Sequence, residues 1–329
     1  MLQKDIDRRK GYTAAVFFSV LVGFSFLGIK ICQRYTGGLN LLCYRYAFAF
    51  VAMMLLMALR IVKIDIRNKP KGKLMLTAFF YVGFMALQVV GLSHSTSVEG
   101  SIIFAVVPIL VKIIASVFLG EKSSWVENVF ICLTVASLVF MIVMGAAKIT
   151  IDPLGTVLLL ISSIMMALSN ILMRYTRNDY APIEITFSIV VFGFIVFHIA
   201  LIVKYIITGE SFGDYFSALA IPQVLVAGAY LGIGCILLSA HLMSYMLSKM
   251  EAAKGTIFGN VSTAISIVAG VVVLGEDLMW YHIVCTALII AGVVGMSLSG
   301  RKKEESNEQR KQQDKRQHKD QLPCGEQDG

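Results

Sequence analysis

The stretch AVVPILVKIIASVFLGEK, Ala105–Lys122, places one lysine inside an apolar run that closes with Gly-Glu-Lys. An ungapped shift of 155 positions lays it on NVSTAISIVAGVVVLGED, Asn260–Asp277, and both runs end in Leu-Gly-Glu followed by a charged residue. The same shift lays Trp125 on Trp280. Self-similarity at one fixed offset indicates an internal repeat.

A second offset extends the repeat toward the start of the chain. A shift of 144 positions pairs four residues of the first half with four of the second, namely Gly11, Ser19, Ser25 and Lys30 with Gly155, Ser163, Ser169 and Arg174. The offset of 144 matches the starts of the two halves, and the offset of 155 matches their ends. The matched segments follow in the same order in both halves. The chain is therefore predicted to consist of two copies of one unit.

Composition indicates the solvent in which these units fold. Hydrophobic residues make up 57% of the chain and charged residues 15%, whereas soluble domains contain about 45–50% and about 25%. Apolar runs of about 20 residues, enough for a helix to cross about 30 Å of hydrocarbon, recur along the sequence. We expect an all-α integral membrane protein with ten transmembrane helices, near 12–31, 39–59, 74–93, 98–119, 125–146, 155–173, 183–207, 222–247, 255–274 and 280–299.

Basic residues predict the orientation. If the N-terminus is cytoplasmic, the cytoplasmic segments hold most of the cations, and the opposite loops offer only Arg34, Lys148 and Lys204. This bias predicts both termini in the cytoplasm of a multi-pass protein of the cell inner membrane. The formal charge of +8 is then explained by topology and the anionic inner leaflet, which weakens any argument for nucleic acid as a partner.

Each repeat contains five spans, an odd number, so the second copy must enter the membrane upside down. Inverted repeats of this kind build many secondary transporters. The expected organisation is a cytoplasmic N-terminus (1–10), a first five-helix repeat (11–148), a second (149–300) and a polar tail (301–329). The tail has too few apolar residues to form a core and is expected to be disordered.

Motifs typical of enzymes, nucleotide-binding proteins and metal sites are missing from the sequence. There is no P-loop, HExxH or GxSxG motif, and the six cysteines show no CxxC or metal-binding spacing. We therefore expect no catalytic residues, no metal and no cofactor.

Several residues carry a resemblance to a known family. A five-helix unit ending in an apolar helix, a Gly-Glu pair and a further helix resembles the EamA branch of the drug/metabolite transporter superfamily. Lys30 in SFLGIKICQRY and Arg45 in CYRYAFAF sit at the family's usual basic positions, and Pro108 lies midway along the fourth helix. The counterpart of Pro108 is Thr263, a departure that puts a kink in the ninth helix in doubt. The resemblance implies transport of a small molecule by alternating access.

Small and polar residues form matching stripes on the fourth and ninth spans. Spacings of 4, 3, 4 and 3 residues put each set on one helix face. The sets are Ser101, Ala105, Pro108, Lys112 and Ala115, and Thr256, Asn260, Thr263, Ile267 and Gly270. Close helix packing would explain the small residues, but it explains Lys112 and Asn260 poorly. Both stripes are expected to face a shared, partly hydrated space.

Lys112 is the most informative residue of these stripes. A lysine near the centre of a span costs roughly 2.5–3.5 kcal/mol on insertion scales, so it requires a partner or water. Three interpretations remain open: contact with a substrate cavity, a structural ion pair, and snorkelling toward the interface. The predicted substrate-binding set also takes in polar residues of other spans, and consists of Lys112, Ser101, Pro108, Asn260, Thr263, Thr256, Gln88, Ser19, Asn170 and His241.

The predicted function is that of a secondary transporter that exports a small organic metabolite, such as an amino acid or a drug-like compound. Its expected partners are that substrate, the lipid bilayer and a coupling proton or other ion. Two alternatives stay open. One is a transporter of nucleotide sugars or other anionic metabolites, and the other is a membrane sensor or scaffold that keeps the fold without transport.

Overall fold

The computed structural model describes residues 2–66, 69, 71–119, 124–147, 152–176, 179–209, 213–249, 252–295 and 298–299. Side chains are not described before Thr13, nor within 115–119, 145–147, 214, 247–249 and 252–260. The expected tail (301–329) and the Gly-Glu pair at 120–121 lie outside the described residues. Helices and short connections make up the described ranges, which contain no strand.

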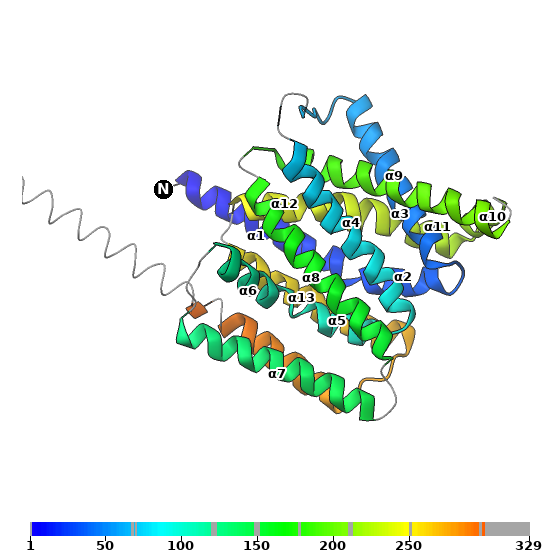
Figure 1. Ribbon diagram of the computed structural model, residues 1–329. Coiled ribbons are helices and arrows are strands. Elements are labelled where there is room, and N and C mark those ends of the chain that lie inside the picture. Colours follow the sequence, from blue (N-terminus) through cyan, green and yellow to red (C-terminus); the bar gives the residue numbers. More distant parts are fainter. Residues whose placement is uncertain are drawn as a thin grey trace, which may run out of the picture.

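Seven helices lie in the described residues of the first half (Figure 1). They are α1 (Leu2–Gly23), α2 (Ser25–Gln33), α3 (Gly38–Ala58), α4 (Lys71–Ser93), α5 (Ser97–Phe104), α6 (Val107–Leu119) and α7 (Trp125–Ala147). The second half begins with α8 (Pro153–Thr176), α9 (Pro182–Thr208) and α10 (Gly213–Leu219). It continues with α11 (Pro222–Ala229), the π-helix η1 (Tyr230–Leu238), α12 (Ser239–Lys249), α13 (Ala252–Leu274) and a final helix, Trp280–Gly295.

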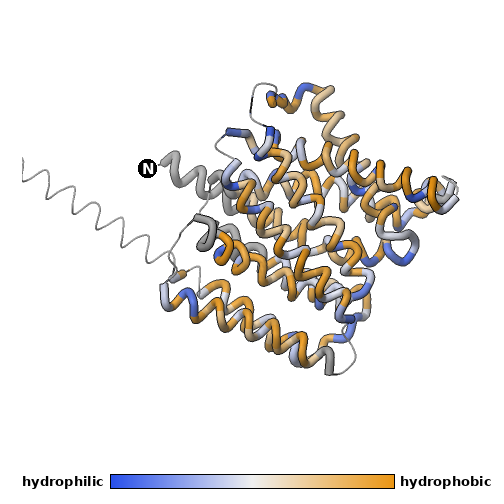
Figure 2. Tube along the Cα trace, viewed as in Figure 1, coloured by the Kyte–Doolittle hydropathy of each residue, from blue (hydrophilic) through white to orange (hydrophobic). Residues whose placement is uncertain are grey.

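Length and apolarity fit a membrane protein. Eight helical stretches of the described chain are long and apolar enough to cross a bilayer, and two shorter apolar helices cover Val261–Leu274 and Trp280–Gly295. The helices are mostly apolar along their length (Figure 2). Apolar side chains such as those of Val226 and Val272 are well exposed. The all-helical membrane fold is confirmed, whereas the count of ten spans stays a prediction.

The equivalent helices α5–α6 and α13 run in opposite directions. The shift of 155 positions carries the bounds of α5–α6 onto those of α13. A Cβ added at Gly270, near the end of α13, would lie 2.5 Å from the Ser97 hydroxyl at the start of α5. The start of one helix therefore lies beside the end of the other. This antiparallel contact fits the inversion that an odd number of spans requires.

A long contact between α4 and α8 joins the two halves (Figure 1). Ser162 Oγ donates to the Phe84 carbonyl at 2.7 Å, and Ser169 Oγ donates to the Thr77 carbonyl at 3.3 Å. Small residues let the backbones approach, since a Cβ added at Gly91 would lie 2.8 Å from the Leu159 side chain. The third and sixth spans thus form a continuous interface.

The helices α7 and Trp280–Gly295 form a pair at one edge of the bundle, along the lower side of Figure 1. A Cβ added at Gly292 would lie 2.1 Å from Thr134 Oγ1, so the two backbones lie very close. Only 28% of the span that begins at Trp125 is buried within the bundle, against 67% of the span that begins at Ser97. The fourth span is therefore central and the fifth peripheral.

Candidate functional site

The central fourth span is broken in its middle. Helix α5 ends at Phe104, and α6 begins at Val107 with Pro108 in its first turn. Proline has no amide hydrogen to donate to the carbonyl four residues earlier, and its ring crowds that carbonyl. By contrast, α13 continues through Thr263 without a break. Discontinuous helices of this kind form substrate sites in many transporters.

A buried hydrogen bond joins α5, the first half of this span, to α13. Ser101 Oγ donates to the Ser97 carbonyl of its own helix and is hydrogen-bonded with Ser266 Oγ of α13, each at 2.6 Å. Ser101 is 1% exposed and Ser266 2% exposed. Ser101, a member of the predicted stripe on the fourth span, thus contacts the ninth span directly. Its partner there, Ser266, is not a member of the predicted stripe on that span.

The Gly275-Glu276 pair at the end of α13 holds the start of α5 in place. Gly275 ends α13 in the left-handed conformation (φ 67°), which glycine adopts without strain. Glu276 then accepts from the backbone amides of Ser97 and Val98, each at 2.9 Å, and from Ser97 Oγ at 2.7 Å. A carboxylate at a helix N-terminus satisfies amides that have no partner within the helix. The Glu276 carboxylate therefore ties the two halves together.

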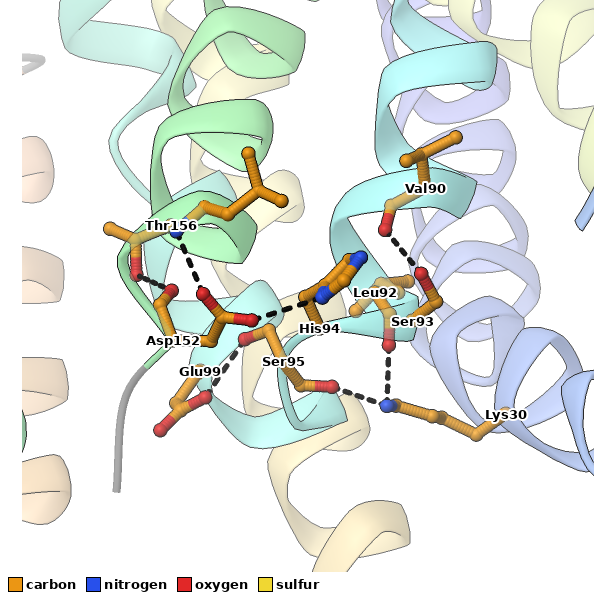
Figure 3. Close-up of polar contacts among 10 residues, drawn as sticks. Lys30, Val90, Leu92, Ser93, His94, Ser95, Glu99, Asp152 and Thr156 are labelled. Atoms are coloured by element: carbon orange, nitrogen blue, oxygen red, sulfur yellow. Dashed lines mark hydrogen bonds and ion pairs between the residues drawn. The ribbon is translucent and has the colours of Figure 1, made fainter. Parts of the chain in front are cut away.

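Further polar contacts surround the connection between α4 and α5, which we call the hinge (residues 94–96) (Figure 3). The Lys30 ammonium donates to the carbonyls of Leu92 and Ser95. His94 Nδ1 lies 2.9 Å from a carboxylate oxygen of Asp152, at the start of α8. Because α2 belongs to the first half and Asp152 to the second, the hinge is held from both sides.

Ion pairs link the halves at the opposite end of the bundle. Lys69 Nζ lies 2.7 Å from Glu184 at the start of α9, and Lys73 Nζ lies 3.0 Å from Asp179. Glu184 is nearly buried, with a side chain 6% exposed, whereas the Lys73 pair is open to water. Exposed pairs contribute little to stability, so the Glu184 contact is the stronger link at this end.

Lys112 has a carboxylate partner. Its Nζ lies 3.7 Å from Glu127 Oε2 in the first turn of α7, and the two side chains are 25% and 2% exposed. Glu127 also caps α7, since it accepts from the Ser124 amide at 2.9 Å. The geometry is that of an ion pair between the fourth and fifth spans. The predicted contact between Lys112 and a substrate stays a prediction.

The remaining predicted site residues lie on several elements. Ser19 on α1, Gln88 on α4 and Thr263 on α13 are buried. Asn170 on α8 and His241 on α12 are half-buried, and Nδ1 of His241 has no hydrogen-bond partner in the described part of the chain. Thr256 and Asn260 belong to α13, but their side chains lie outside the described residues.

Arg45 on α3 is the most completely buried charged side chain described, at 1% exposure. Its Nη2 lies 3.3 Å from the Met85 sulfur, and Nε and Nη1 have no partner within the described residues. The π-helix η1 packs directly against this turn, because a Cβ added at Gly232 would lie 2.4 Å from the Arg45 carbonyl oxygen. Local π-helix often marks a functional site.

The sequence analysis did not predict the roles of Glu127 and Ser266. It also did not predict that Arg45 lacks an oxygen acceptor among the described residues. A usable signal existed for Glu127, because Ser124 and Glu127 have the S-x-x-E spacing of a capping box. No local signal places Ser266 opposite Ser101, since the two residues are far apart in the chain and meet only through tertiary packing.

Comparisons with known proteins agree with this arrangement of two halves. The profile of the EamA-like transporter family matches residues 9–143 and again residues 153–298. The uncharacterized transporter YcxC of Bacillus subtilis (strain 168) is 33% identical over 89% of this chain and 94% of its own length. An uncharacterized transporter of Archaeoglobus fulgidus is 23% identical over 82% of this chain and 92% of its own length.

Structural similarity covers most of the bundle as well. A solved crystal structure shares the fold with a TM-score of 0.65 at 13% identity, over 90% of this chain and 99% of that one. The double match of the family profile, the identity to YcxC and the helical membrane fold together show that this chain belongs to the EamA-like transporter family.

Proposed function

We propose that this protein is an inner-membrane secondary transporter that exports a small organic metabolite by alternating access. The substrate passes between the two halves, near the break between α5 and α6. Membership of the EamA-like transporter family supports transport. The export direction and the cytoplasmic termini rest on the resemblance and on the distribution of basic residues.

One observation carries the mechanism. At the hinge end, α5 and α13 are closed on each other by the Ser101–Ser266 hydrogen bond and by the Glu276 cap on α5. A substrate leaving between these helices must break both contacts. Alternating access therefore requires a second state in which α5 and α13 separate at this end while the opposite end closes.

Cross-linking tests this requirement. The Ser101 and Ser266 hydroxyls are 2.6 Å apart, so cysteines at both positions come within reach of a disulfide. The Ser101→Cys/Ser266→Cys variant is made in a background without native cysteines and reconstituted in proteoliposomes. We expect oxidation to abolish flux of a transported compound and a reductant to restore it, because the disulfide holds the hinge end closed.

The two single-cysteine variants are the matched controls and should keep their flux under oxidation. Full flux through protein in which the disulfide has formed would contradict separation of α5 from α13. A reconstituted protein that binds metabolites but moves none of them would instead favour a sensor or scaffold.

A further inference from the structure

The guanidinium of Arg45 has no oxygen acceptor in the described part of the chain. It can donate five hydrogen bonds, yet within the described residues its one hydrogen-bond partner is the thioether of Met85, which is a weak acceptor. Arg45 is the eighth residue of α3, about 10 Å along the helix from its start. The charge therefore lies buried in the bundle, within a candidate membrane span.

Two other cationic side chains of the spans, Lys30 and Lys112, have oxygen partners. Lys30 donates to two backbone carbonyls, and Lys112 faces the Glu127 carboxylate. Described ion pairs involve neither α3 nor the residues around Arg45. A buried charge without a partner is strongly unfavourable, and intramembrane cations are retained chiefly where they act on a substrate or an ion.

The surroundings of Arg45 come from both halves of the molecule. Its guanidinium lies 3.3 Å from the Met85 sulfur of α4, and its backbone carbonyl lies against Gly232 of η1. Neither of these neutral groups can compensate a positive charge. Arg45 thus lies where spans of the first half meet the irregular span of the second, between the parts that alternating access moves.

We propose that Arg45 binds the carboxylate group of the transported metabolite. The proposal rests on the proposed transport function and names the chemical class of its substrate. The planar fork of a guanidinium matches the two oxygens of a carboxylate, and a charge-assisted pair of this kind is strong where water is excluded.

The charge balance favours a carboxylate over a phosphate ester. One guanidinium neutralises one negative charge, whereas a phosphate dianion would leave a second charge buried. Among the described residues, the one polar contact of the Arg45 guanidinium is a thioether, which offers no second positive charge. A monocarboxylate fits this charge balance best.

Binding is tested on the full-length protein purified in detergent, by thermal unfolding. Each proteinogenic L-amino acid is compared with its carboxamide, which differs only in the charged group. Acetate, pyruvate and benzoate are compared with sodium chloride at equal ionic strength. We expect at least one carboxylate to raise the unfolding temperature by several degrees, because a ligand of the folded state stabilises it. Its amide or chloride counterpart should have no effect.

The Arg45→Met variant keeps an apolar stem and removes the charge. We expect it to unfold, without added ligand, at the same temperature as the wild type or higher, because an uncompensated buried charge is lost. Its affinity for the stabilising carboxylate should fall about 30-fold or more. Arg34→Met, at an exposed position beyond α2, removes the same charge and should leave affinity unchanged.

Three results of the binding and unfolding measurements would overturn the proposal. One is the absence of stabilisation by every carboxylate tested, and another is equal stabilisation by chloride or by the amides. The third is a large loss of stability in Arg45→Met, which would make Arg45 a structural cation. Flux in proteoliposomes separates this proposal from the proposed function. If flux survives in Arg45→Met, the carboxylate site is wrong and the proposed transport stands. If the wild type binds carboxylates but shows no flux, the proposed transport is wrong and the binding site stands.

Discussion

Lys112 and Glu127 form a pair with unequal exposure, at 25% and 2%. Removing the lysine would leave the carboxylate buried without its cation. We predict that Lys112→Met lowers the free energy of unfolding by about 1–3 kcal/mol, less than for a fully buried pair because Lys112 is partly solvated. Thermal unfolding of the detergent-purified protein measures this change.

The double variant Lys112→Met/Glu127→Gln separates stability from transport. It should recover most of the lost stability, since no unpaired charge remains. If Lys112 also contacts the substrate, as its place on the stripe of the fourth span predicts, flux per folded molecule stays low in the double variant. Normal flux in the double variant would leave Lys112 a purely structural role.

The break between α5 and α6 belongs to the scale of the helix. We predict that Pro108→Ala restores a hydrogen bond to the Phe104 carbonyl and stabilises the protein by about 1 kcal/mol or more. Flux should fall, because a continuous helix cannot bend between two states at this point. Pro153→Ala, at the first position of α8 where proline is tolerated, is the control. Unchanged flux in Pro108→Ala would show that the break is incidental.

The contact between η1 and α3 depends on a close approach of the two helix backbones. In Gly232→Ala the new Cβ would lie 2.4 Å from the Arg45 carbonyl oxygen, so the two helices must move apart. We predict a marked loss of folded protein in fluorescence-detected size-exclusion chromatography. Gly72→Ala, with nothing within 4 Å of the added Cβ, should leave the yield unchanged. Equal yields of the two variants would contradict the close contact.

At the scale of the whole molecule, the positive-inside bias predicts which end of the bundle faces the cytoplasm. We expect a cysteine in place of Lys63 to resist a membrane-impermeant maleimide in intact cells, and one in place of Tyr35 to react. Both positions are exposed, so accessibility to the reagent reports only the side of the membrane. The reverse pattern would invert the proposed topology and the export direction.

Much of the fold is predictable because its signals are local. Apolar runs about 20 residues long predict spanning helices, since every backbone group must find its hydrogen bond within the segment. The offset of 155 positions predicts matching helices, and Pro108 predicts the break in the fourth span. The Gly-Glu pair at 275–276 likewise marks the end of α13, because glycine accepts the left-handed conformation there.

By itself, then, the sequence determined a two-copy helical membrane protein, its approximate spans and its likeness to one transporter family. Only the tertiary structure decided the partners of the polar groups. Glu127 lies beside Lys112, Glu276 caps α5, and Arg45 has no acceptor among the described residues. The physical reason is that helical periodicity tells which residues share a face, but the partner of a buried charge is set by packing between helices distant in the chain.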